Sequence, residues 1–128
     1  MSCLFRSLSA FVSGDNETTL RSKIVDYLMQ NPELQEGMTA EEVIKSEEDG
    51  QSFAMYLGRM RRGMIWGGAI EIKAFCDMHK TKVCVHIRRN RQGDHPEIEF
   101  VPQTGQYDFV AHILWTGNHF EPIRCERV

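Results

Sequence analysis

The cysteines are the residues with the clearest chemical potential, because a thiolate can act as a nucleophile or bind a metal. The chain has four: Cys3, Cys76, Cys84 and Cys125. Cys76 lies in an apolar helical stripe and Cys84 inside a predicted strand, so both are expected to pack as small core residues, whereas Cys125 lies in a charged tail and is expected to be exposed. Cys3 opens a predicted helix, where free N–H groups favour a thiolate and can bind an oxyanion during acyl transfer. Position alone leaves two interpretations of Cys3, a nucleophile and a buried residue at a helix start.

Five histidines are candidate bases for such a cysteine. His119 follows a tight turn at residues 116–118 and opens an extended segment, and loops on rigid strands often carry catalytic groups. Glu121 lies two residues further on, so in an extended segment it shares the face of His119. A carboxylate in that position can fix the tautomer of the imidazole, although a surface His-x-Glu pair without function has the same pattern. The other histidines occupy positions that need no catalytic role, at a helix end, in a turn or within strands: His79, His95, His86 and His112.

The predicted elements place these residues in a chain of helices followed by strands. Apolar residues at helical spacing predict helices at residues 4–12, 18–31, 51–62 and 69–79, with a short acidic helix that opens at a capping box over 39–42. After residue 80 the apolar period changes to two, which predicts strands at residues 83–87, 97–101, 109–115 and 119–123. Turn signals separate the strands at 92–94 and 103–106. This segregated order predicts an α+β fold with a mostly antiparallel or mixed sheet.

Length and composition exclude several classes of protein. The chain has 128 residues, 41% of them hydrophobic and 26% charged, as in an ordinary globular domain and unlike a disordered chain. Its net charge of −3 disfavours bulk electrostatic binding to nucleic acid or to an anionic membrane. No apolar run is long enough to span a bilayer, and the N-terminus does not resemble a secretory signal. We therefore expect a cytoplasmic protein with reduced cysteines.

Three short motifs together resemble a known family. They are Cys-Leu-Phe-Arg-Ser-Leu at residues 3–8, Trp-Gly-Gly-Ala-Ile-Glu-Ile at 66–72 and Gly-Asn-His-Phe-Glu-Pro-Ile at 117–123. In this order and at these intervals they resemble the ovarian tumour (OTU) family of cysteine proteases, which are mostly deubiquitinases. The first two motifs are most similar to the subgroup associated with endoplasmic-reticulum quality control and to viral or microbial members. The resemblance covers nearly the whole chain and implies a papain-type fold, with a small central sheet flanked by helices.

The resemblance implies roles for individual residues. Cys3 is then the nucleophile and His119 the general base. Glu121 falls where many members carry Asp or Asn as the residue that orients the histidine, and Asn118 is a lesser candidate for that role. Glu departs from the family pattern because its side chain is one methylene longer.

The resemblance also implies a substrate channel and a substrate. Trp66, Gly67 and Gly68 fall where the family lines the channel for the C-terminal tail of ubiquitin. Ubiquitin ends in Gly-Gly, and glycines in the enzyme allow the close backbone approach that a narrow channel needs, although a plain helix-entry turn has the same sequence. The implied activity is thiol-dependent hydrolysis of isopeptide bonds at the C-terminus of ubiquitin. Ubiquitin or polyubiquitin chains are the expected partners of a monomer that needs no metal or other cofactor.

The start of the chain qualifies this expectation. We expect a single OTU-like catalytic domain over residues 1–128, with the N-terminal leader to the cysteine missing, because only Met1 and Ser2 precede Cys3. In the family, an extended loop precedes the cysteine and often carries an Asp three positions before it. An alternative function is therefore a non-catalytic ubiquitin-binding module on the same fold.

Two other functions compete with this interpretation. A structural zinc site could use four residues in a Cys-x2-His-x4-Cys-x-His pattern, Cys76, His79, Cys84 and His86, but this spacing is uncommon and the neighbours are apolar. Nucleic-acid binding could use two arginine clusters: Arg59, Arg61 and Arg62, and Arg88, Arg89 and Arg91. Because the net charge is negative and no aromatic motif accompanies the arginines, we expect no nucleic-acid partner.

Overall fold

The computed structural model describes residues 3–35, 37–47, 52–88 and 97–128. The helices are α1 (Cys3–Ser9), α2 (Glu17–Gln30), α3 (Ala40–Glu47), α4 (Phe53–Arg61) and α5 (Ala69–His79). The strands are β1 (Glu33–Gln35), β2 (Met38–Thr39), β3 (Thr81–Ile87), β4 (Glu97–Phe100), β5 (Phe109–Trp115) and β6 (Phe120–Arg127). The predicted turn at 92–94 and His95 lie outside the described residues.

The main sheet has the strand order β4-β3-β5-β6. β3 pairs with β5 in parallel, while the β3–β4 and β5–β6 pairs are antiparallel. A separate two-stranded hairpin joins β1 to β2. The predicted α+β class with a mixed sheet is therefore confirmed, and the small hairpin is an element that the sequence pattern did not predict.

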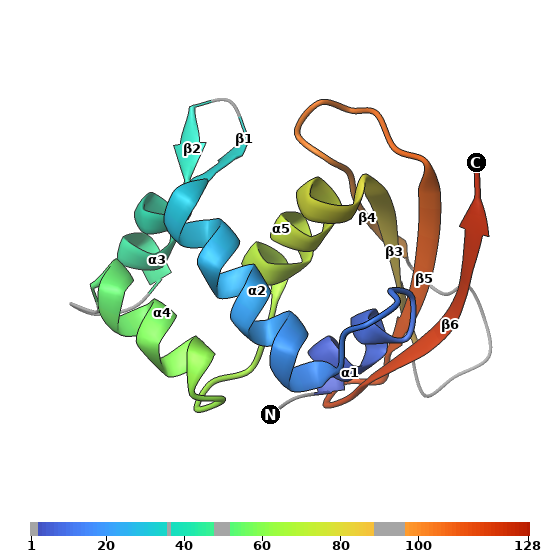
Figure 1. Cartoon of the computed structure of the whole chain (residues 1–128), viewed down its shortest axis with the longest axis horizontal. Helices are drawn as coiled ribbons and strands as arrows, with labels where there is room; N and C mark the ends of the chain where they lie inside the picture. Colours follow the sequence, from blue (N-terminus) through green and yellow to red (C-terminus); the bar gives the residue numbers. More distant parts are fainter. Residues whose placement is uncertain (1–2, 36, 48–51, 89–96) are drawn as a thin grey trace.

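The hydrophobic core lies between the helices and one face of the main sheet. Because side chains alternate along a strand, Val83 and Val85 of β3 and Ala111 and Ile113 of β5 point to the same face, and all four are buried in the core. Helix α5 packs on β3 and β4 and also contacts α2, so it lies between α2 and the sheet, while α3 and α4 are farther from the sheet (Figure 1). None of the described helices is long and apolar enough to cross a membrane.

Capping interactions explain where two of the helices begin. Asn16 caps α2: its side-chain oxygen accepts hydrogen bonds from the backbone N–H groups of Thr18 and Thr19, both at 2.9 Å. The Thr19 hydroxyl oxygen accepts from the Asn16 N–H at 2.9 Å, which completes a capping box. Helix α4 begins at Phe53, two residues after the predicted start at residue 51, because Ser52 caps it by accepting from Met55 N–H at 3.1 Å.

Two elements end at different residues from those predicted. Helix α1 ends at Ser9 because Phe11 and Val12 bond to carbonyls only three residues back, in tight turns that lead to Gly14 at φ +85°. Both residues still pack partly buried against the core, which accounts for their helical spacing. Strand β6 continues beyond the predicted end at 123, because β5 offers a pairing edge back to Phe109. Cys125 therefore lies in β6, and it is exposed as predicted.

Candidate active site

Cys3 is the first residue of α1, and its position is fixed by the core beneath it. Only 8% of its surface is exposed, and the two residues that follow, Leu4 and Phe5, are fully buried. The hydroxyl of Ser7 donates a hydrogen bond to the Cys3 carbonyl at 2.8 Å, in the buried first turn of the helix. The N–H groups of this turn have no acceptor within the helix. The predicted helix start at Cys3 is confirmed.

His119 lies in the hairpin turn between β5 and β6. Thr116 N–H donates to the His119 carbonyl at 3.0 Å, and Gly117 adopts φ +105°, a left-handed conformation that suits glycine. At the base of the turn, Trp115 and Phe120 pair across the strands with their ring centroids 4.6 Å apart. The His119 side chain itself is exposed.

The fold brings the elements of Cys3 and His119 together. Helix α1 contacts β6, and the N-terminal end of α1 lies at the same end of the molecule as the β5–β6 turn (Figure 1). Glu121 is exposed in β6, opposite Leu114 of β5, and within the described part of the chain no hydrogen bond joins its carboxylate to the His119 ring. Pairing of Cys3 with His119, and orientation by Glu121 or Asn118, therefore remain predictions.

The segment of Trp66, Gly67 and Gly68 lies directly against α1. A Cβ atom placed on Gly67 would be 2.8 Å from Leu4 Cδ2 and 2.8 Å from Phe5 Cε2, so it would fit only if these buried side chains moved. Gly67 is therefore required for a close approach between this segment and the residues that follow Cys3. Trp66 is 55% exposed, which is unusual for so large an apolar side chain.

Glu71 also contacts this segment, and no role was predicted for it from the sequence. Its carboxylate is buried in the first turn of α5, where Oε1 accepts from Gly68 N–H at 2.7 Å and Oε2 accepts from the Tyr56 hydroxyl at 2.6 Å. Burial raises the pKa of Glu71 to about 7, although the Tyr56 and Gly68 hydrogen bonds and the positive charge of Arg21 oppose that rise.

Arg21 is a second buried charge that was not predicted from the sequence. Its Nη1 donates to the carbonyls of Met60 at 2.9 Å and Ile65 at 3.2 Å, and its guanidinium lies 4.2 Å from the centre of the Phe5 ring. Burial lowers its pKa, while the charge of Glu71 raises it. Arg21 precedes Ile24 by three positions on α2, so it falls on the apolar face of that helix, and this pattern could have marked it as buried.

Cys76 and Cys84 do not come together with His79 and His86 as a zinc site. Cys76 lies in the core, where its thiol contacts the Phe100 carbonyl at 3.4 Å, and burial raises its pKa to about 12. His79 follows on α5, whereas Cys84 and His86 point to the opposite face of the sheet, because they alternate with Val83 and Val85. The expected core packing of Cys76 is confirmed, and the four residues lie in two separate places.

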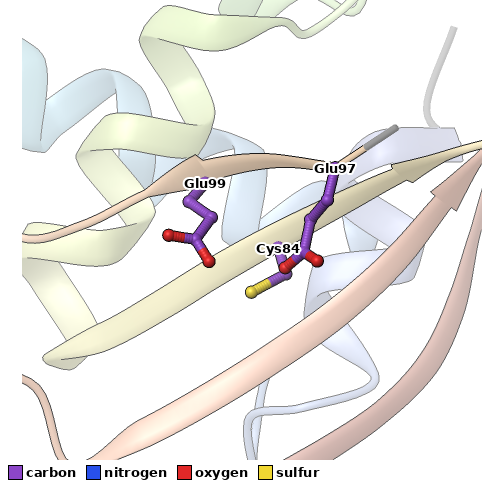
Figure 2. A group of neighbouring side chains, drawn as sticks. All are labelled: Cys84, Glu97 and Glu99. Carbon is purple, nitrogen blue, oxygen red and sulfur yellow. The ribbon is translucent and has the colours of Figure 1, made fainter. Parts of the chain in front are cut away.

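Cys84 belongs to a polar group on the outer face of the sheet. Its Sγ and one carboxylate oxygen each from Glu97 and Glu99 lie within 4.8 Å of one another (Figure 2). Such a group could hold a metal ion, but its members already have partners: the Cys84 thiol bonds to Glu97, and Lys82 Nζ lies 3.0 Å from Glu99 Oε2. Burial, followed by the hydrogen bond to Glu97 and then the negative charge of Glu97, raises the pKa of Cys84 to about 12, so its thiol is not poised as a thiolate.

The arginine clusters are only partly described. Arg61 pairs with Asp26 at 2.5 Å, and the Arg62 Nε donates to the Gly58 carbonyl at 3.2 Å. Arg89 and Arg91 lie outside the described residues. Both arginines therefore make contacts within the protein, as arginines on a helix surface commonly do.

Comparison with known proteins gives one family and several similar folds. A family model described as OTU-like cysteine protease matches residues 2–120 of this chain. No curated protein matches the chain at a significant level.

Solved structures with low sequence identity share this fold. The OTU domain of OTUD1 is 16% identical with a TM-score of 0.68, and the match covers 98% of this chain and 79% of that one. An ovarian tumour domain solved in complex with ubiquitin is 18% identical with a TM-score of 0.68, covering 98% of this chain and 64% of that one. An OTU deubiquitinase from Wolbachia pipientis wMel, solved bound to ubiquitin, is 18% identical with a TM-score of 0.67, covering 96% and 89%. At these identities the likeness is one of fold.

Proposed function

This chain belongs to the OTU-like cysteine protease family, and we propose that it is a deubiquitinase that hydrolyses isopeptide bonds at the C-terminus of ubiquitin. Two of the similar structures are complexes with ubiquitin, which supports ubiquitin as the partner. The observation that carries the proposal is the meeting of three separate motifs at one end of the fold. Gly67 packs on Leu4 and Phe5, immediately after Cys3, and α1 contacts the strand that follows His119.

In the proposed reaction, Cys3 attacks the carbonyl carbon of the last glycine of ubiquitin. His119 takes the thiol proton, and the carbonyl oxygen becomes an oxyanion that the free N–H groups of the first turn of α1 can stabilise. The intermediate then breaks its C–N bond, and the lysine amine leaves with the proton from His119. Water, deprotonated by His119, hydrolyses the thioester and releases a carboxylate and the free thiol. Glu121 is the proposed orienting residue for the imidazole.

Trp66, Gly67 and Gly68 are proposed to form one wall of the channel for the ubiquitin tail. A Gly-Gly tail carries no side chains, so it can pass through a narrow channel where the enzyme backbone comes close. The close packing of Gly67 on α1 supports this placement, because it sets the wall beside the cysteine. The exposed Trp66 ring offers an apolar surface at the channel entrance.

Hydrolysis of ubiquitin carrying a fluorogenic amide at its C-terminus tests this proposal. The wild-type protein is expected to release the fluorophore, Cys3→Ala to release none, and His119→Ala to be slower by about 100-fold or more, the range of general base catalysis. Cys125→Ala is the matched control, because Cys125 is exposed near the far end of β6 and should keep wild-type activity. Binding of ubiquitin without any hydrolysis would refute the enzyme and favour the non-catalytic binding module.

A further inference from the structure

We propose that Glu71 is a positioning residue, which holds the channel segment 66–68 against the helix that carries Cys3. Glu71 does not line the channel; it acts through the backbone of Gly68, to which it is hydrogen-bonded. This inference deepens the proposed function and rests on it for the identity of the substrate. The geometric part of the inference concerns the protein alone and can be tested without any substrate.

The carboxylate of Glu71 meets two donors that approach from different elements. Gly68 N–H lies at the start of α5, and the Tyr56 hydroxyl comes from α4. Both groups donate, so both oxygens of Glu71 must accept, which only an ionised carboxylate does with full strength. Glu71 therefore ties the end of the channel segment to α4.

Arg21 holds the chain that leads from α4 to the channel segment. It donates from α2 to the carbonyls of Met60 and Ile65, which lie just before the channel segment. Its guanidinium also lies over the ring of Phe5, on α1. The segment between α4 and α5 is thus held by a buried cation before it and a buried anion after it, and the two charges attract each other.

Through Gly67, the position of the channel segment affects the position of Cys3. Gly67 is in tight contact with Leu4 and Phe5, so a shift of the segment must either open a gap against α1 or push on the residues after Cys3. Displacements of about 1 Å in a site of this kind can reduce rates by about 100-fold. Glu71 can therefore control how well a substrate tail is aligned with Cys3 while it touches neither.

The ionisation of Glu71 predicts a pH dependence that packing alone would not produce. The groups that face it are Tyr56 from α4, the Gly68 N–H of its own capping turn and the more distant Arg21 from α2. Burial outweighs these partners and the backbone N–H of Glu71 itself, and brings the pKa of Glu71 to about 7. Below that pH the carboxylate loses its charge: Oε1 can still accept from Gly68 N–H and the protonated Oε2 can donate to the Tyr56 hydroxyl, but both hydrogen bonds become neutral and therefore weaker. Alignment of the segment should therefore weaken as the pH falls.

Amide hydrogen exchange tests the geometric part first. Replacing Glu71 by Ala removes the acceptor of Gly68 N–H, so its exchange should accelerate by about tenfold or more, as expected for a hydrogen bond to a charged group. Glu71→Gln keeps one neutral acceptor and should rescue most of the protection, to within about fivefold of wild type. Tyr56→Phe leaves Gly68 bonded and should give a smaller change. Glu126→Gln, at the far end of β6, is the matched control and should change nothing.

Kinetics then test the consequence for the site. In Glu71→Ala, kcat/KM for the ubiquitin amide should fall by about tenfold or more, while alkylation of Cys3 by iodoacetamide changes less than twofold, because alkylation needs no channel. The ratio of the two rates should decline below pH 7 in the wild type and stay flat in Glu71→Gln. A merely structural role would change both rates together, in proportion to the unfolded fraction.

Each result decides one of the two proposals. Wild-type protection of Gly68 in Glu71→Ala, or equal losses in both rates, overturns the role of Glu71 whatever the substrate is. If Glu71→Ala does not fold, Glu71→Gln decides through its pH profile, since a profile that falls like that of the wild type overturns the inference. A wild-type protein that leaves the ubiquitin amide intact refutes the proposed function, while the exchange measurements still decide the role of Glu71.

Discussion

Replacing Gly67 by alanine perturbs the contact between the channel segment and α1. The added methyl group would lie 2.8 Å from both Leu4 Cδ2 and Phe5 Cε2, whereas carbon atoms pack at about 3.5–4.0 Å, so the neighbours must move by about 1 Å. Leu4 and Phe5 are fully buried, and the guanidinium of Arg21 holds the Phe5 ring at 4.2 Å. Overpacking of this kind costs about 1–3 kcal/mol of folding free energy.

Urea unfolding of three proteins measures this cost. Gly67→Ala should lower the unfolding free energy by about 1–3 kcal/mol. Gly58→Ala makes the same chemical change inside α4, where the nearest atom to the new Cβ is the mobile tip of Arg62 at 3.5 Å. Since glycine is a poor helix former, Gly58→Ala should raise the unfolding free energy by about 0.5–1 kcal/mol. The two substitutions are therefore expected to have opposite signs.

Activity gives the second readout for Gly67→Ala. The methyl group pushes on the residues that follow Cys3, so hydrolysis of the ubiquitin amide should fall by up to about 100-fold even where the protein is fully folded. Gly58→Ala should keep wild-type activity. A Gly67→Ala protein with wild-type stability and activity would refute the inference that this glycine sets the distance between the channel segment and the cysteine.

Three further predictions concern the buried charges and thiols. Since burial raises the pKa of Glu71 from 4.5 to about 7, the folded protein holds a proton that the unfolded chain releases, so this group lowers the unfolding free energy by about 3 kcal/mol as the pH rises through that interval. Urea titrations at pH 5 and 7 should show this slope as a difference between the wild type and Glu71→Gln. Arg21→Met leaves the buried carbonyls of Met60 and Ile65 without their donor and should lower the urea midpoint, at a cost of about 3 kcal/mol. Brief iodoacetamide treatment of the native protein should modify Cys125 and spare Cys76 and Cys84, whose pKa values burial raises to about 12; rapid labelling of either, seen by peptide mass mapping, would contradict their assignment as buried thiols.

Local patterns were enough to predict most of the fold. The change of apolar period near residue 80 separates the helices from the strands of the main sheet, although it misses the β1–β2 hairpin, and the predicted strand at 109–115 matches β5 residue for residue. Helix α1 is shorter than its apolar spacing suggests, because Phe11 and Val12 reach the core from turns. The parallel pairing of β3 with β5 joins strands that are separated by β4 in the chain, and a single sequence carries no signal for such a choice.

Only part of the candidate site could be proposed from the sequence. Its motif residues Cys3, His119 and Gly67 were proposed from short recognisable segments, and their roles remain predictions. The buried pair of Arg21 and Glu71 could not be proposed, because charged residues are normally exposed unless they are paired, and the partner of each lies on another element. A charged residue on an otherwise apolar helix face, as at Arg21, is the pattern that would have indicated the pair.

Covalent capture by ubiquitin with an electrophile at its C-terminus tests the role of Cys3 most directly. The wild-type protein is expected to form one adduct, which peptide mass mapping places on Cys3. The adduct should persist in Cys125→Ala and disappear in Cys3→Ala. An adduct on any other cysteine, or ubiquitin binding without any adduct, would contradict the assignment of Cys3 as the nucleophile.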